Sequence, residues 1–168
     1  RMSPEQIVEL RVLVARRRAG RLDAPDLGRF QDAFRSLERS LNQAQLLLAP
    51  RSAQPRRSFR VTCSLDVDLA LRGVRHRGRV QSLSLGGFSA VVSERPEVGA
   101  GTGLALWFPP QELPFEAHAT CRAVVPLGPR WRGCFEFMGL SVEQRERLQL
   151  EVLDLVLELL WPAPRLQG

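Results

Sequence analysis

The sequence has no lysine, only two histidines and only three cysteines among its 168 residues. The cysteines, Cys63, Cys121 and Cys134, lie far apart and lack the C-x-x-C spacing of metal and redox sites. We therefore expect no metal site and three reduced thiols within the core. Reduced thiols, together with a charged N-terminal segment unlike a signal peptide, favour a cytoplasmic location.

Long apolar runs are also missing. The most apolar segment, residues 148–161, is interrupted by Glu151, Asp154 and Glu158, and is too short and too charged to span a bilayer. Hydrophobic residues make up 44% and charged residues 25% of the chain, which is typical of a globular protein with one ordinary domain and a small appendage. Because the chain begins at Arg1 and not at methionine, a fragment of a longer protein remains an open alternative.

Catalytic motifs are absent as well. The sequence contains no G-x-S-x-G, no H-E-x-x-H and no phosphate-binding G-x-x-x-x-G-K-[ST]. We therefore predict a protein that is not an enzyme and has no cofactor.

All 24 basic residues are arginine, and the net charge is +6. The planar arginine fork matches phosphate oxygens and the edge of guanine, so this bias suits a nucleotide ligand. A GC-rich coding bias explains the missing lysines equally well. Nonspecific nucleic-acid binding through the arginines is a weaker alternative, because few aromatic residues accompany them as a stacking platform. No specific nucleic-acid partner is expected.

The first 49 residues predict a helical hairpin. Residues 4–19 form a helix that Gly20 ends, and Asp23 is placed to cap a second one. The second helix has apolar residues at alternating spacings of three and four, as in a coiled coil: Leu27, Phe30, Phe34, Leu37, Leu41, Ala44 and Leu48. The sequence leaves two alternatives for this seam. It forms a coiled coil with a second copy or a protein partner, or it packs on the rest of the same chain.

Residues 50–60 are a proline-containing linker, and residues 61–168 predict a barrel or sandwich with a C-terminal helix. Apolar and polar residues alternate from Val61 to Leu71, the period of a strand with one buried face. Further strands fit residues 78–83, 88–92, 104–108, 113–125 and 130–138. Six strands with short turns indicate a small antiparallel architecture. On the fifth strand, His118 falls on the solvent side.

The last helix begins at a capping box formed by Ser141 and Gln144 and runs to about Trp161. It has two apolar stripes, one of Leu148, Val152, Leu155 and Leu159 and one of Leu150, Leu153, Leu157 and Leu160. This apolar surface is too wide for a helix that merely lies on a barrel. One stripe needs a second partner, either the N-terminal hairpin or another subunit.

Two short motifs flank the first strand. The first is R-x-x-x-R, with Arg56, Arg57 and Arg60, where the linker enters the barrel; the second is S-L-S-L-G-G, residues 82–87. A flexible arginine segment before a strand is able to fold over a ligand on the barrel wall. A serine followed by two glycines lets the backbone approach an anion. Each motif alone is weak, since such arginine spacings arise by chance and S-L-G-G also fits a plain turn.

Together, these motifs resemble the PilZ family of cyclic di-GMP receptors, whose signature is R-x-x-x-R and then, about one hairpin later, [D/N]-x-S-x-x-G. The resemblance covers residues 56–160. It includes the strand order, the S-x-E-Q-R-E-R-L start of the last helix at residues 141–148, and the glycine and aromatic run of the last strand, Gly133, Phe135 and Phe137.

The resemblance implies a mostly β fold, a six-stranded antiparallel PilZ-like barrel with a C-terminal helix, here preceded by an αα-hairpin. It also implies a cyclic di-GMP site in which the arginines grip guanine and phosphate and a turn supports the ligand: Arg56, Arg57, Arg60, Ser82, Ser84, Gly86 and Gly87. One position departs from the family, because Ser82 stands where the family has Asp or Asn. The alternative function is therefore a PilZ-like scaffold that binds no nucleotide and acts through protein partners.

Overall fold

A computed structural model describes residues 3–48 and 59–160 of the chain. It divides into two compact units, residues 1–59 with 153–168 and residues 60–152. The last helix contributes residues to both units. In chain order the elements are α1 (Pro4–Arg18), α2 (Ala24–Leu48), β1 (Val61–Leu71), β2 (Val74–Leu83), β3 (Gly87–Val92), β4 (Gly101–Leu106), β5 (Phe115–Leu127), β6 (Arg130–Met138) and α3 (Val142–Leu160).

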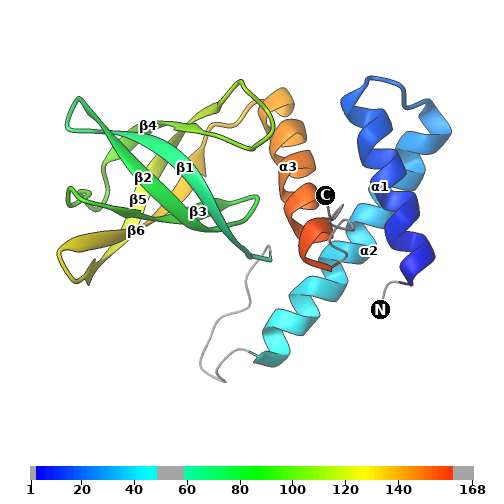
Figure 1. Cartoon of the computed structure of the whole chain (residues 1–168), viewed down its shortest axis with the longest axis horizontal. Coiled ribbons are helices and arrows are strands. Elements are labelled where there is room, and N and C mark those ends of the chain that lie inside the picture. The colour runs from blue at the N-terminus through cyan, green and yellow to red at the C-terminus, as the bar shows by residue number, and fades with distance from the viewer. Residues whose placement is uncertain (1–2, 49–58, 161–168) are drawn as a thin grey trace, which may run out of the picture. The chain divides into compact units, whose positions relative to one another are not determined.

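Six antiparallel strands form a closed barrel in the order β1-β2-β3-β6-β5-β4 (Figure 1). The predicted fold class is confirmed. Of the two architectures that the strand pattern allowed, a barrel or a sandwich, the chain forms the barrel. Strand β1 has the predicted bounds, but β2 begins at Val74 and not at residue 78. The cause is a two-residue turn in which Arg72 and Gly73 both have positive φ, a geometry that continues the twist of the flanking strands.

Phenylalanine side chains fill the barrel. Phe88 stacks on Phe135 with ring centroids 5.0 Å apart, and Phe115 meets Phe137 edge-on at 6.0 Å. Phe108 joins them at 6.3 Å from Phe115. The phenylalanines of β3, β5 and β6 therefore all face inward, and for Phe115 on β5 this agrees with the alternation predicted from the sequence.

The helical unit consists of the α1–α2 hairpin and the last turns of α3. Phe30, Phe34 and Leu37 of the predicted seam are buried, whereas Leu41 is half-buried and Ala44 is exposed. The Arg11 guanidinium donates to the Leu157 carbonyl at 3.0 Å, and Arg18 pairs with Asp154. The sequence left open what α3 packs on besides the barrel. These contacts show that its last turns pack on the hairpin.

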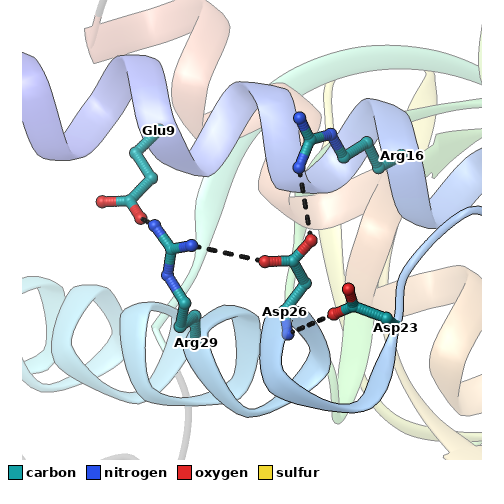
Figure 2. A network of polar contacts seen from close by, with 5 residues as sticks. All are labelled: Glu9, Arg16, Asp23, Asp26 and Arg29. Carbon is teal, nitrogen blue, oxygen red and sulfur yellow. Dashed lines mark hydrogen bonds and ion pairs between the residues drawn. The ribbon is translucent and has the colours of Figure 1, made fainter.

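An ion network joins the two helices of the hairpin (Figure 2). Asp26 lies between Arg16 at 3.2 Å and Arg29 at 3.3 Å, and Arg29 also pairs with Glu9. The Asp23 carboxylate accepts the Asp26 N–H at 2.9 Å, which confirms the predicted cap. None of the helices that the structure describes is long and apolar enough to cross a membrane.

Candidate ligand-binding site

Of the arginine motif, the structure describes Arg60, which lies beside the serine-glycine turn. Arg56 and Arg57 lie outside the described residues. Arg60 is exposed and directly precedes β1, whose first residue, Val61, pairs with Leu83 of β2. The chain register therefore brings Arg60 to the level of residue 84, where the second motif forms its turn.

The turn of residues 84–87 is held by the Ser84 hydroxyl. Its Oγ accepts the N–H groups of Gly86 and Gly87, each at 3.2 Å, and donates to the Gly87 carbonyl, also at 3.2 Å. The backbone N–H of Ser84 adds a bond of 2.8 Å to the same carbonyl. An anion that takes these two glycine N–H groups must therefore displace the buried Ser84 hydroxyl from them.

Gly87 has a packing role besides its place in the motif. A Cβ atom built at this position would lie 2.0 Å from the Phe135 carbonyl oxygen. Its strand partner on β6 is Glu136. Only glycine lets β3 approach β6 this closely, so the barrel itself requires the residue, whatever the turn binds.

Ser82 is engaged by a residue that sequence reasoning missed. Its Oγ lies 2.6 Å from the Oγ of Ser89, its strand partner on β3, and Ser89 is only 6% exposed. The pair could not be found from the sequence, because it depends on the register of β2 against β3, which a bulge after Val80 shifts.

A groove of about 610 Å³ adjoins the turn. Leu85 and Gly86 form one wall, Glu136 and Phe137 of β6 line the groove, and the first turns of α3 contribute Arg145 and other residues. Sequence reasoning did not select Glu136 or Arg145. Two features of the sequence could have indicated them. Glu136 alternates with two inward phenylalanines and therefore points outward, and Arg145 lies in the polar start of α3.

The remaining titratable groups point to no second site. Burial raises the pKa of the Cys63 thiol to about 11 and also raises the pKa of the Cys121 thiol. All three cysteines are free, but only Cys121 is fully buried; Cys63 and Cys134 are half-buried, so the expectation of three core thiols was wrong for those two. His118 is exposed, as predicted. Among the described residues, no group of three or more His, Cys, Asp or Glu side chains is able to hold a metal ion.

The barrel and its turn match known proteins of one kind. The sequence profile described as "PilZ domain" matches residues 54–154, more than half of the chain. The chain therefore belongs to the PilZ domain family. None of the curated proteins compared with it is significantly similar.

Solved structures show the same fold at low identity. The PilZ domain of YcgR from Escherichia coli, described with c-di-GMP, is 22% identical, with a TM-score of 0.54 over 63% of this chain and 95% of that domain. The complex of YcgR with c-di-GMP is 24% identical, with a TM-score of 0.56 over 64% of this chain and 48% of that one. The K. pneumonia MrkH complex with c-di-GMP is 16% identical, with a TM-score of 0.56 over 64% and 55%. The matched region thus spans about half of the longer YcgR and MrkH chains.

Proposed function

We propose that this protein is a receptor for cyclic di-GMP and not an enzyme. The observation that carries the proposal is the meeting of two motifs within the PilZ match: R-x-x-x-R leads into Val61, which pairs with Leu83 directly before the turn of residues 84–87. Arg56, Arg57 and Arg60 would bind phosphate and guanine, since the arginine fork matches both. Ser82, Ser84, Gly86 and Gly87 would support the ligand on the barrel wall.

Relatives of the same fold support this ligand. The YcgR and MrkH structures named above are described as complexes with c-di-GMP. In the proposed mechanism, the ligand draws residues 51–60 onto the barrel, and this ordering of the linker changes the relation between barrel and helical hairpin. A ligand that fixes the position of a segment is a common form of signalling switch.

A titration of cyclic di-GMP by calorimetry tests the proposal. We expect heat of binding for the wild type and a loss of affinity for Arg56→Ala, because a charge-assisted bond contributes roughly 1.5–3 kcal/mol, or about 10- to 150-fold in affinity. Arg130→Ala is the matched control, since Arg130 is exposed and has no polar partner among the described residues. No heat at about 100 micromolar ligand, already a weak affinity, would contradict the proposal.

The second candidate is a PilZ-like scaffold that binds no nucleotide. Ser82 favours it, because a short, uncharged hydroxyl already bonded to Ser89 at 2.6 Å stands where the family has Asp or Asn. Binding by Ser82→Asp but not by the wild type would establish the scaffold. Its partner would dock on the helical hairpin.

Oligomeric state and location belong to the same proposal. The partly exposed seam of α2, with Leu41 half-buried and Ala44 exposed, is compatible with a homodimer or a protein partner through a coiled coil. Sedimentation with and without ligand measures both the oligomeric state and its response. A reducing, cytoplasmic location is supported by the three free cysteines.

A further inference from the structure

We infer that the groove between the turn of residues 84–87 and the start of α3 binds one guanine nucleotide of the ligand. In this arrangement the Glu136 carboxylate accepts hydrogen bonds from the Watson–Crick edge of the guanine, and the Arg145 guanidinium binds phosphate. The inference rests on the proposed function and deepens it, because it assigns the carboxylate that Ser82 does not provide.

Glu136 is placed beside the turn and is accessible. It pairs across strands with Gly87, and its side chain is 53% exposed. Its carboxylate accepts from Arg122 Nε at 2.7 Å, and the Arg122 side chain is itself 55% exposed. An exposed ion pair of this kind contributes little to stability, so the carboxylate is available to a ligand while Arg122 limits its orientations.

Arg145 supplies the opposite charge within the same groove. It lies in the first turns of α3 and is exposed, and its guanidinium has no polar partner among the described residues. A guanidinium without a partner, facing a concave surface, is suited to bidentate bonds with a phosphate. The groove thus combines the two chemistries that a guanylate needs, an acceptor for the base and a donor fork for the phosphate.

The size and the walls of the groove fit a purine. Its volume of about 610 Å³ lies in the range of about 300–1,000 Å³ that is usual for small-molecule sites. Apolar side chains line it between the charged groups: Leu85, Phe137, Leu140, Val142 and Leu148. These surfaces are able to cover the faces of a base while Glu136 contacts its edge.

Ser82 and Glu136 lie on opposite sides of the turn. Ser82 is on β2 and Glu136 on β6, with β3 between them, which corresponds to about 10 Å at the usual strand spacing. Glu136 therefore does not replace Ser82 in space. It offers a carboxylate to a base that extends across the turn. The separation of the two residues is within the dimensions of a cyclic dinucleotide.

Base discrimination provides the decisive measurement. Guanine presents N1–H and N2–H donors to a carboxylate, whereas adenine has an acceptor at N1 and no 2-amino group. We expect Glu136→Gln to weaken cyclic di-GMP binding about 10- to 100-fold and to reduce the preference for cyclic di-GMP over cyclic di-AMP. Glu94→Gln is the matched control, because the Glu94 side chain is 44% exposed and also pairs with an arginine, Arg72, at 3.1 Å.

The phosphate contact is separable from the base contact. Both dinucleotides carry the same phosphates, so Arg145→Gln should weaken both about equally, by roughly 10-fold, and leave their ratio unchanged. Arg132→Gln is its control, since Arg132 is exposed and has no polar partner in the described part of the chain. A merely structural effect of either variant would change the melting temperature, which is measured in parallel.

The outcomes distinguish this inference from the function on which it rests. Wild-type affinity and base preference in Glu136→Gln would overturn the inference and leave the receptor function standing. Binding by Ser82→Asp but not by the wild type would overturn the inference and establish the scaffold, with the site still formed by the fold. Absence of binding in both the wild type and Ser82→Asp would overturn both.

Discussion

The barrel and the helical hairpin are each stabilised internally by a different kind of contact. In the barrel, buried aromatic rings and close backbone contacts dominate, as between Phe88 and Phe135 or between Gly87 and the Phe135 carbonyl. In the hairpin, a short buried seam around Phe30 is accompanied by ion pairs on the surface, including Arg29 with Glu9. Exposed ion pairs contribute little individually, so the barrel depends more fully on buried packing and close backbone contacts.

This difference bears on where a ligand site is possible. The turn of residues 84–87 is attached to the barrel by a hydrogen bond of 2.9 Å from the Phe137 N–H to the Gly86 carbonyl. A site built on such a framework keeps its geometry when surface charges change.

The largest expected effect compares one buried ring from each unit. Phe115 is 1% exposed in the barrel and Phe30 is fully buried in the hairpin, and loss of either ring to alanine costs about 3–5 kcal/mol. Trp107 and Trp131 lie on the barrel, so their fluorescence, in a Trp161→Phe background, follows barrel unfolding. We expect Phe115→Ala to lower the fluorescence midpoint and Phe30→Ala to lower mainly the helical circular-dichroism midpoint. A common shift of both signals by either variant would show one cooperative unit.

A smaller loss is expected at the closest backbone approach. Gly87→Ala places a Cβ atom 2.0 Å from the Phe135 carbonyl oxygen, and we expect a loss of about 3 kcal/mol in the free energy of unfolding, measured with urea. Gly101→Ala is the control, because a Cβ atom there meets no other atom within 4 Å. Equal stability of the two variants would refute the structural role assigned to Gly87.

The ion network of the hairpin should contribute less. Asp26→Asn removes the charge that pairs with both Arg16 and Arg29, and we expect a loss of about 1 kcal/mol, reduced further by salt. Asp32→Asn serves as the control, since Asp32 is an exposed α2 residue without a polar partner in the described ranges. A loss as large as that of Phe30→Ala would contradict the contrast drawn between the two units.

The last expected effect is a pH dependence in the barrel, which solvent reduces because the Cys63 side chain is only half-buried. The chain has neither lysine nor tyrosine, whose side chains would otherwise titrate near pH 10. Burial raises the pKa of Cys63 from 9.0 to about 11, so the unfolded chain loses this proton first as the pH rises. The free energy of unfolding should then fall across this window. Urea titrations of the wild type and Cys63→Ala test this, and an unchanged decline in Cys63→Ala would assign the effect elsewhere.

Most of the fold could be read from local patterns. The alternation from Val61 to Leu71 predicted β1, and the Ser141 capping box predicted the start of α3, where the Ser141 hydroxyl accepts the Gln144 N–H at 3.1 Å. Asp68 departed from its pattern: predicted on the solvent side, it is only 8% exposed, with Arg77 Nε at 2.5 Å from its carboxylate. Asp68 is buried because it pairs with Arg77 on the neighbouring strand. This pairing depends on the register of the two strands, which the alternation within one strand does not specify.

The candidate site was predictable only in its motifs. The sequence indicated Arg60 and the turn of residues 84–87, because short motifs are local. It did not indicate Ser89, Glu136 or Arg145, since these reach the turn from other strands and from α3. The positions of Ser89 and Glu136 depend on the pairing of β3 with β2 and with β6, and that of Arg145 depends on where α3 begins.

For this protein, the sequence alone determined the identity of the strands and helices, the family and the two motifs, because each follows from residue order within a short segment. The tertiary structure decided how the motif residues are used. It engages the Ser82 and Ser84 hydroxyls in hydrogen bonds of 2.6 and 3.2 Å and brings Glu136 opposite Gly87. Barrel closure fixes strand register, and register determines which side chains from distant segments become neighbours.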